Sequence, residues 1–341
     1  MMDSTIVAIL VQDGVVNGAI YALLALSLVL VFAVTRVVFV PQGEFVAYGA
    51  LTYAALDAGT VPGSLWLLCG LGAAAFLAGV WQRQGLIRQA LACLLLPAVV
   101  TGLTIWLAPL KPGIAVNALL ALAIVTPMAP YLYRVGFQPL AQASVLVLLI
   151  AAVAVHLVLA GLGLVFFGPE GSRAAAFSDA TLAFGDQTIP GQALWIVGLT
   201  AALMAGLYGF FGFTLFGKAL RATAVNRLGA RLVGISTVQS GSIAFALAGA
   251  IGALSGILIV PLTTVYYDSG FIIGLKGFTA AIIAGMASYP GAVLAALAVG
   301  LLESFSSFWA SAFKEVIVFT AIIPVLLWRS LRHVALEDEN E

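Results

Sequence analysis

Long apolar runs, separated by short polar breaks or by breaks containing glycine and proline, dominate this chain. A bilayer core requires roughly 20 apolar residues for each helix that crosses it, and somewhat fewer where a broken helix is surrounded by protein. About eleven runs meet this requirement, at 14–34, 43–58, 63–81, 86–108, 113–133, 143–166, 191–214, 238–260, 272–288, 290–310 and 313–330. The pattern predicts an all-α fold, a polytopic transmembrane helical bundle of about nine to eleven membrane segments that forms one domain over 1–341.

Two of the predicted segments are short and begin or end at helix breakers. The 43–58 run follows Pro41-Gln42-Gly43, and the 272–288 run precedes Pro290-Gly291. Proline breaks a helix and glycine lets the backbone turn. Discontinuous helices are tolerated at membrane depth only where they are buried in protein or line a cavity. Both segments therefore point to a pathway, although tight turns between helices explain them equally well.

Composition agrees with a chain that lives in lipid. Hydrophobic residues make up 63% of the 341 residues and charged residues only 8%, whereas soluble domains carry about 25% charged residues. Cys69 and Cys93 lie inside apolar runs and are expected to be core residues, not a disulfide or a metal pair. The N-terminus has no basic region before its first apolar run, so we expect a retained span and not a removable signal.

The basic residues predict an orientation. If the C-terminus is cytoplasmic and the chain alternates across each span, three basic residues fall outside, namely Lys111, Arg173 and Lys314, and Lys276 falls within a span. The remaining basic residues then fall inside: Arg36, Arg83, Arg88, Arg134, Lys218, Arg221, Arg227, Arg231, Arg329 and Arg332. The positive-inside rule produces this distribution and the inverted topology violates it. We therefore predict a periplasmic N-terminus and a cytoplasmic C-terminus.

The same map assigns the two longest polar segments. Residues 168–190 form a large external loop that is able to meet an outside partner. Residues 215–237 form the largest internal loop, in which helix-forming residues alternate with basic ones. Gly229 and Gly234 are expected to interrupt the segment. A short basic amphipathic helix of this kind can bind anionic lipid or can occupy a groove of a soluble partner. The residues alone leave both alternatives open.

Three stretches of the chain together carry a resemblance to a known family. The first is VNGAIYALLALSLVLVFAVTRVVFVPQGEFVAYGAL at 16–51, an opening helix followed by a broken one. The second is GKALRATAVNRLGARLVGIST at 217–237, which is similar to the coupling loop of the family. The third is GLKGFTAAIIAGMASYPGAVLAALAVGLLES at 274–304, with a Lys-x-Phe-Thr-Ala-Ala segment and a following Pro-Gly. On these stretches the chain resembles the permease subunits of branched-chain amino acid ABC transporters of the high-affinity Liv type. With their spacing, the three stretches cover most of the chain apart from 82–133.

The resemblance implies a bacterial inner-membrane importer whose subunits have separate roles. A periplasmic solute-binding protein would deliver the small-molecule solute, this chain and a second homologous permease subunit would form the pathway, and two cytoplasmic ATP-binding subunits would drive it. The coupling loop would contact the ATPase through Lys218, Arg221, Asn226, Arg227, Ala230, Arg231, Gly234 and Ile235. Two departures are noted. Val225-Asn226 stands at a place where relatives can carry acidic residues, and 82–133 adds a helical pair that could be peripheral.

No motif for covalent chemistry is present, so we expect no catalytic residues, no metal, no cofactor and no nucleic-acid partner. The segment from Gly212 to Ala219 nearly matches the phosphate-binding loop motif. It lacks the Ser or Thr that would hold magnesium, and it follows a membrane helix instead of a strand. The two histidines, His156 and His333, form no metal-ligand spacing and no catalytic triad.

Ionisable residues within spans are the sharpest site candidates. Inserting one such residue into the bilayer at a helix centre costs roughly 2.5–3.5 kcal/mol of free energy. An ionisable residue within a span therefore normally faces a protein interior and has a partner. Glu44, Lys276 and Glu303 are the candidates, and Lys276 pairs either with Glu303 or with Glu44 to tie the broken segments to the bundle. Alternatively, Lys276 and Glu44 flank the solute route and move between states. His156 is expected to be a neutral, hydrogen-bonded interior histidine.

Other polar side chains on the broken or polar-bearing segments are expected to contribute to the wall of the pathway. They are Gln42, Glu44, Tyr48, Thr279 and Ser304.

Small and aromatic residues have structural explanations. Gly14-x-x-x-Gly18 and Gly252-x-x-x-Gly256 allow close approach of helices, within the chain or at a seam between permeases. Five tryptophans near predicted span ends are interpreted as interface anchors: Trp66, Trp81, Trp106, Trp309 and Trp328.

Three other functions are compatible with the composition. A permease of the same superfamily could carry urea, short amides, aromatic carboxylates or sugars. An ion-coupled secondary transporter should show two similar halves with matched broken helices, and the two breaks here are not convincingly repeated. A purely structural membrane subunit would tolerate loss of the 217–235 loop without losing transport.

Overall fold

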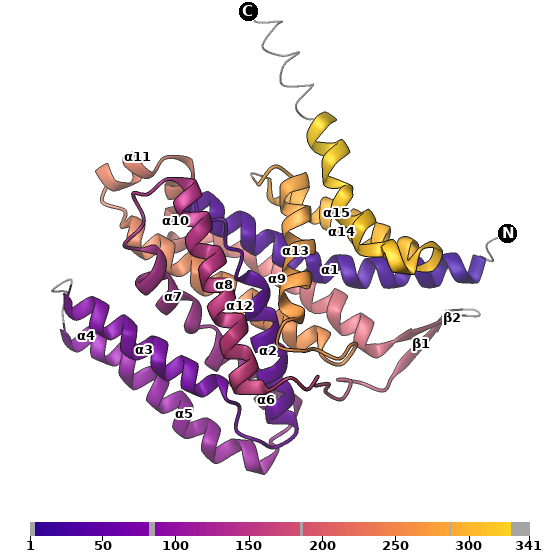
Figure 1. Ribbon diagram of the computed structural model, residues 1–341, viewed down its shortest axis with the longest axis horizontal. Helices are drawn as coiled ribbons and strands as arrows, with labels where there is room; N and C mark the ends of the chain where they lie inside the picture. Colours follow the sequence, from indigo (N-terminus) through magenta and orange to yellow (C-terminus); the bar gives the residue numbers. More distant parts are fainter. Residues whose placement is uncertain (1–3, 82–85, 185–186, 287, 329–341) are drawn as a thin grey trace, which may run out of the picture.

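The structure is a computed structural model that describes residues 4–81, 86–184, 187–286 and 288–328. Within these ranges the chain is almost entirely helical, and nine helical stretches are long and apolar enough to cross a membrane. They are Thr5–Thr35, Ser64–Trp81, Leu91–Leu110, Ile114–Phe137, Val145–Phe167, Gly191–Phe213, Thr237–Ile259, Tyr289–Trp309 and Ser311–Trp328. The predicted polytopic helical bundle is confirmed (Figure 1).

The two short segments are the helices α2 (Gln42–Asp57) and α13 (Ser269–Ile283). α2 has the expected limits, with Pro41 directly before its first turn. α13 begins and ends earlier than the predicted 272–288, because Gly285 and Met286 adopt positive φ angles of 73° and 52° and end the helix. Together with the nine long stretches, these two helices account for all the predicted segments.

The helix α1 (Ser4–Thr35) lies at the centre of the bundle and is almost completely buried over its apolar length. It packs most extensively on α14 (Tyr289–Trp309) and also contacts α12 (Thr237–Ile259) and α13. At the α1–α14 crossing, a Cβ added at Gly14 or Gly18 would overlap the α14 backbone. These small residues therefore allow backbone contact inside the chain, and their assignment to a seam between permeases is wrong.

A second close contact joins α2 to α12 and α13. A Cβ at Gly256 would overlap the backbone of α2, and so would a Cβ at Gly270. Gly43 of α2 faces the backbone of Gly270 in return. Only glycine lets these three helices approach so closely, which is how membrane helices associate without a hydrophobic driving force between them.

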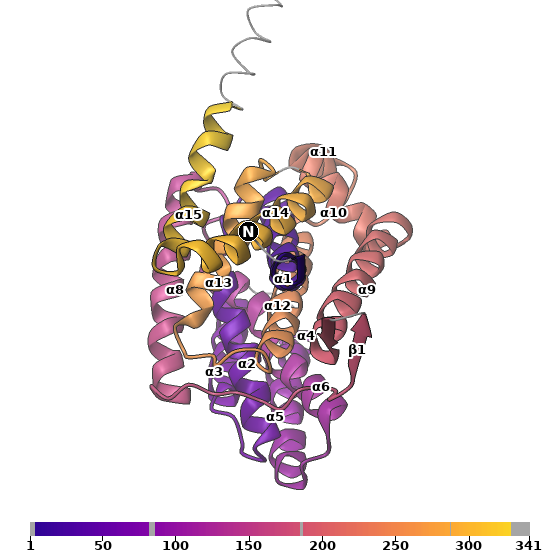
Figure 2. The ribbon, with the colours of Figure 1, turned by 90° about the vertical axis from the view of Figure 1, so that its right-hand side faces the viewer.

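Four other helical stretches form the outer parts of the molecule. On opposite flanks lie α8 (Val145–Phe167) and α9 (Gly191–Phe213), with α1 and α12 between them (Figure 2). α15 (Lys314–Thr320) resumes after a turn at Ala321 and continues to residue 328, while α3 (Ser64–Trp81) lies at the far side beside α5. The five tryptophans expected at span ends are all exposed, as lipid-facing anchors would be.

The 82–133 region, which the sequence comparison suggested as an extra helical pair, has two unlike halves. Its first half consists of α4 (Leu86–Ala90), a π-helical turn at Leu91–Leu95 and α5 (Leu96–Leu107), which is largely exposed. Its second half consists of α6 (Ile114–Val125) and α7 (Met128–Leu132) with a following π turn at Tyr133–Phe137, and it packs against α2, α3 and α12. Only the first half is therefore peripheral. Arg83 lies outside the described residues, as do Arg329, Arg332 and His333.

The predicted 168–190 loop contains the one hairpin of the described chain, β1 (Thr181–Phe184) paired antiparallel with β2 (Gln187–Pro190). The loop is fixed to the connection between α12 and α13. Ser172 pairs with Val265, and the Arg173 guanidinium donates hydrogen bonds to the carbonyls of Pro261 and Leu262 at 3.2–3.3 Å. The hairpin and the described N-terminal end lie far from α10 (Leu215–Val225) and α11 (Arg227–Leu232) (Figure 1).

Candidate functional site

The predicted coupling segment is two helices and not one. The Thr214 hydroxyl accepts a hydrogen bond from the Gly217 amide at 3.0 Å and caps α10. The Asn226 side chain accepts from the Gly229 amide at 2.9 Å and caps α11. Asn226 has an extended backbone, so the helix breaks there, and Gly229 lies inside α11 instead of interrupting the segment. Gly234, with φ 86°, ends the pair.

The pair is attached to the central helices by specific contacts. Leu220 of α10 is fully buried against Leu30 of α1 and Ala244 of α12. The hydroxyls of Thr223 and Ser240 lie 3.1 Å apart, and the Arg231 Nε donates to the Thr237 hydroxyl at 3.1 Å. A displacement of α10 and α11 would therefore act directly on α1 and α12.

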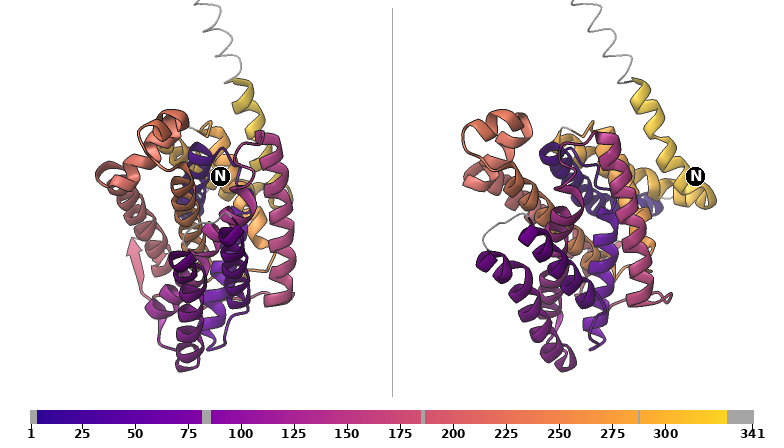
Figure 3. Two further views of the ribbon diagram at one scale, coloured as in Figure 1. Left: turned by 90° about the vertical axis from the view of Figure 1, so that its left-hand side faces the viewer. Right: turned by 60° about the vertical axis from the view of Figure 1, so that its left-hand side comes forward.

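The outer side of the pair is an open groove between α10 and α11 of about 590 Å³. Figure 3 shows the two helices projecting from one end of the bundle. The residues that line the groove are Lys218, Arg221, Ala222, Val225, Asn226, Gly229, Ala230 and Val233. Basic groups and apolar surface are thus combined on one open face.

Large apolar side chains are exposed on this element. Val225 is 86% exposed, Leu232 is 81% exposed, and Leu228 and Val233 are similarly open. Sequence reasoning concentrated on the basic residues and missed these four. The available signal was their presence in a polar loop outside any predicted span. Exposed apolar groups of this kind mark protein interaction sites.

The predicted coupling residues differ in their exposure and in whether they contact the bundle. Lys218, Arg221, Asn226, Arg231 and Gly234 are exposed, although Arg231 also bonds to the bundle, whereas Ala230 is buried and forms the floor of the groove. The remaining two are half-buried: Arg227 and Ile235.

The charge of this element is positive and uncompensated within its own sequence. Residues 215–237 contain four basic side chains and no acidic one. Burial lowers the pKa of the Arg227 guanidinium, the Tyr133 phenol partly opposes this, and the nearby charges of Arg231 and Arg36 lower it further. The Arg227 Nε is also buried without a hydrogen-bond partner among the described residues. An acidic group supplied by a partner would satisfy it.

The intramembrane charges form two separate clusters. In the first, the Lys276 ammonium lies 2.6 Å from Glu303 and 3.1 Å from Glu315. The Tyr21 hydroxyl donates to the other Glu303 oxygen at 2.5 Å. The cluster joins α1, α13, α14 and α15. Of the two predicted partners for Lys276, Glu303 is the one found. Glu315 and Tyr21 were missed, because nothing in the sequence brings them near Lys276.

Glu44 belongs to the second cluster, so its predicted alternative pairing with Lys276 is wrong. Its Oε1 lies 2.9 Å from the His156 Nδ1, and the imidazole stacks on Phe271 with ring centroids 4.5 Å apart. The bundle places α8 beside the first turn of α2, which brings His156 within reach. His156 is a hydrogen-bonded interior histidine, as expected.

The other predicted pathway residues are buried within this chain. The Gln42 amide donates to the Ala248 carbonyl at 2.9 Å, and the Tyr48 hydroxyl donates to the Leu159 carbonyl at 2.9 Å. Thr279 donates to Leu275 within its own helix, and Ser304 donates to the carbonyl of Leu10. Apart from the bond of Thr279, these contacts tie different parts of the chain together. A part for these residues in solute passage stays a prediction.

Known proteins resemble this chain over most of its length. A family model described as a branched-chain amino acid transport system permease component matches residues 10–326. The high-affinity branched-chain amino acid transport system permease protein LivH of Salmonella typhimurium is 32% identical over 209 residues, which is 57% of this chain and 65% of the relative. BraD of Pseudomonas aeruginosa, with the same description, is 28% identical over 226 residues, or 64% of this chain and 74% of the relative.

The chain therefore spans about 65% of the length of the LivH relative. Among solved structures, a chain of PsaBC from Streptococcus pneumoniae in complex with Fab aligns over 93% of this chain and 89% of its own length. Its TM-score is 0.37 and its identity 11%, a likeness too weak to carry an argument. Because the family model covers nearly the whole described bundle, this chain belongs to the permease-component family of branched-chain amino acid transport systems.

Proposed function

We propose that this protein forms half of the translocation pathway of an ATP-driven importer for branched-chain or related hydrophobic amino acids. A periplasmic binding protein delivers the solute and a second homologous permease subunit completes the pathway. Two cytoplasmic ATP-binding subunits supply the energy. The names of the LivH and BraD relatives support the solute class, and the polytopic fold supports a role as a membrane component.

The observation that carries the proposal is the surface of α10 and α11. It combines four exposed apolar side chains, an open groove and a basic charge without acids of its own. Protein interfaces have an apolar core surrounded by polar groups. We infer that an ATP-binding subunit covers this surface and that an acidic group of that subunit pairs with Arg227.

The hydrogen bonds behind the surface provide the route for energy transfer. Arg231 and Thr223 are bonded to α12, and Leu220 packs on α1 and α12. Movement of the ATP-binding subunit would pull α10 and α11 and, through these contacts, the central helices. The proposal uses the orientation predicted from the basic residues, with a periplasmic N-terminus and a cytoplasmic C-terminus. In that orientation α10 and α11 are cytoplasmic, and the hairpin of β1 and β2 is periplasmic.

Reconstitution with candidate ATP-binding subunits tests the proposal. The variant carries Val225→Asp and Leu232→Asp, which place charges in the apolar part of the contact without disturbing buried residues. We expect the subunits to associate at least tenfold more weakly, because interface hot spots cost 2 kcal/mol or more when they are lost. Solute uptake should fall with association, measured in proteoliposomes together with ATP hydrolysis.

The matched control is Leu182→Asp. Leu182 is an exposed apolar residue of β1, at the other end of the molecule, and receives the same substitution. It should leave association with the ATP-binding subunits unchanged. A second pair, Arg227→Glu and Arg231→Glu, should uncouple hydrolysis from uptake. If the double aspartate variant binds and couples like the unmodified protein, the assignment of α10 and α11 as the coupling element is wrong.

A further inference from the structure

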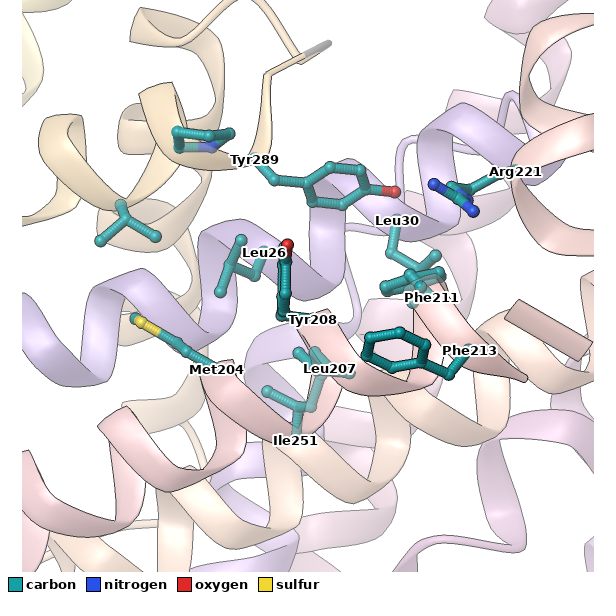
Figure 4. Close-up of a pocket in the computed structure, with 13 residues that line it drawn as sticks. Leu26, Leu30, Met204, Leu207, Tyr208, Phe211, Phe213, Arg221, Ile251 and Tyr289 are labelled. Atoms are coloured by element: carbon teal, nitrogen blue, oxygen red, sulfur yellow. The ribbon is translucent and has the colours of Figure 1, made fainter. Parts of the chain in front are cut away.

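A large apolar groove lies between α9 and the central helices, on a different side of α10 from the coupling surface. It has a volume of about 550 Å³. Its wall is formed mainly by aliphatic and aromatic side chains of α1, α9, α12 and α14, including Leu26, Leu207 and Phe211 (Figure 4). The groove is half open to the surroundings of the protein. Of its lining residues, only Arg221 also lines the coupling surface.

On the α9 side, the groove is left open at Gly212, one of its lining residues. A Cβ added at Gly212 would meet no atom within 4 Å. Only 11% of the apolar length of α9 is buried. In the centre of the bundle, the space beside glycines such as Gly43 and Gly256 is occupied by neighbouring backbone. The space beside Gly212 contains no protein atom.

One end of the groove is polar and positively charged. Arg221 of α10 lies there, and the hydroxyl of Tyr289 points toward its guanidinium (Figure 4). The Tyr208 hydroxyl contributes a second donor to the lining. None of the described residues that line the groove is acidic. Since α10 follows directly after the membrane helix α9, this end lies at the membrane surface whichever way the chain is oriented.

We propose that the groove binds an anionic phospholipid. An acyl chain occupies the apolar part, and the phosphate of the headgroup lies against Arg221 and the two tyrosine hydroxyls. Basic pockets between membrane helices bind anionic headgroups, and tyrosine is favoured at headgroup level. The combination of an apolar wall and one cationic end matches an anionic lipid, because every such lipid has a phosphate directly beside its acyl chains, whereas a helix of another protein would need an acidic group at one particular position.

Binding would place a lipid beside the coupling element. Arg221 lines both this groove and the groove between α10 and α11. The bound headgroup would therefore hold α10 at its attachment to the bundle. This inference concerns the chain's own lipid contact and does not depend on which solute is carried.

The test measures lipid retention by the purified chain with native mass spectrometry. Phosphatidylglycerol is compared with phosphatidylcholine of the same acyl chains. We expect Arg221→Gln to weaken phosphatidylglycerol binding about fivefold, the effect of one basic side chain near an anionic surface, and to leave phosphatidylcholine unchanged. Gly212→Leu should lower retention of both lipids, because the new side chain enters the groove from a position with no atom in its way.

Two matched controls make the result specific. Lys218→Gln removes a basic charge from the same helix without touching the groove, and Gly198→Leu adds the same side chain to an equally open position of α9 outside it. Both should retain lipid like the unmodified chain. The proposal is overturned if Lys218→Gln weakens binding as much as Arg221→Gln, or if Gly212→Leu has no effect on lipid. It is also overturned if Gly212→Leu instead abolishes a dimer, since the occupant would then be protein.

Discussion

The centre and the flanks of the bundle are built differently although both consist of apolar helices. In α1, 89% of the apolar span is buried, whereas in α8 the share is 22% and in α9 it is 11%. Yet α8 is the more apolar of the first two by hydropathy. In the membrane the surroundings of an exposed helix are as apolar as a protein core, so hydropathy does not sort helices by burial.

Two other features separate the centre from the flanks. Central helices touch through glycines whose added Cβ would overlap neighbouring backbone, and they carry the buried charges of Lys276 and Glu303. Along the rest of α9 after its first residue, a Cβ added at Gly198, Gly206, Gly209 or Gly212 would meet no atom within 4 Å. The comparison teaches that small residues and intramembrane polar groups identify the centre only when something packs on them. The same residue types on a flank leave room for lipid.

The largest effect is expected from removal of the central ammonium. Lys276→Met leaves the buried Glu303 carboxylate and its neighbour Glu315 without a cation. We expect a loss of about 3–5 kcal/mol in the free energy of unfolding, the usual result of breaking a buried pair from one side. Unfolding of the purified chain in mixed micelles by a denaturing detergent measures it.

A double substitution tests whether the loss comes from the pair. Lys276→Met together with Glu303→Gln removes one of the two orphaned carboxylates and should recover part of the stability. Equal losses in the single and double variants would argue against the pairing. Lys314→Met is the control, because Lys314 lies at the start of the outer helix α15, and its change should stay within about 0.5 kcal/mol.

A smaller effect is expected from one methyl group in a central helix contact. In Gly43→Ala, the new Cβ would overlap the backbone of Gly270, so α2 and α13 must separate. The expected loss is about 1–3 kcal/mol, as for other overpacked positions. Gly198→Ala places the same methyl group in open space on α9 and should cost nothing. If both variants unfold at the same detergent concentration, the contrast between centre and flank is wrong.

The smallest effect concerns the link between α10 and the central helices. Because the Thr223 hydroxyl donates to the Ala219 carbonyl, the Ser240 hydroxyl donates to Thr223. Ser240→Ala removes this bond, and we expect a cost of about 0.5–1.5 kcal/mol. Hydrogen exchange should accelerate in α10 and stay unchanged in α14. The exposed Ser307→Ala serves as the control, and faster exchange throughout the bundle would contradict a local role.

The sequence by itself determined where the chain crosses the membrane. Apolar runs of bilayer length and breakers such as Pro41 are local features, and they predicted all eleven segments and the start of α2. The basic segment at 215–237 was equally visible, because charged residues stand out against an apolar background.

Only the tertiary structure decided which groups meet. In the structure Lys276 pairs with Glu303 and Glu315, and Glu44 pairs with His156. The surface around Gly14 and Gly18 is covered by α14 of the same chain. The tertiary structure also divided the coupling segment at Asn226 and left a groove beside α9. Span positions depend on local hydrophobicity, which a sequence states directly. Partners depend on how helices distant in the chain rotate and cross, and lipid-facing and protein-facing surfaces are too similar in composition to reveal that beforehand.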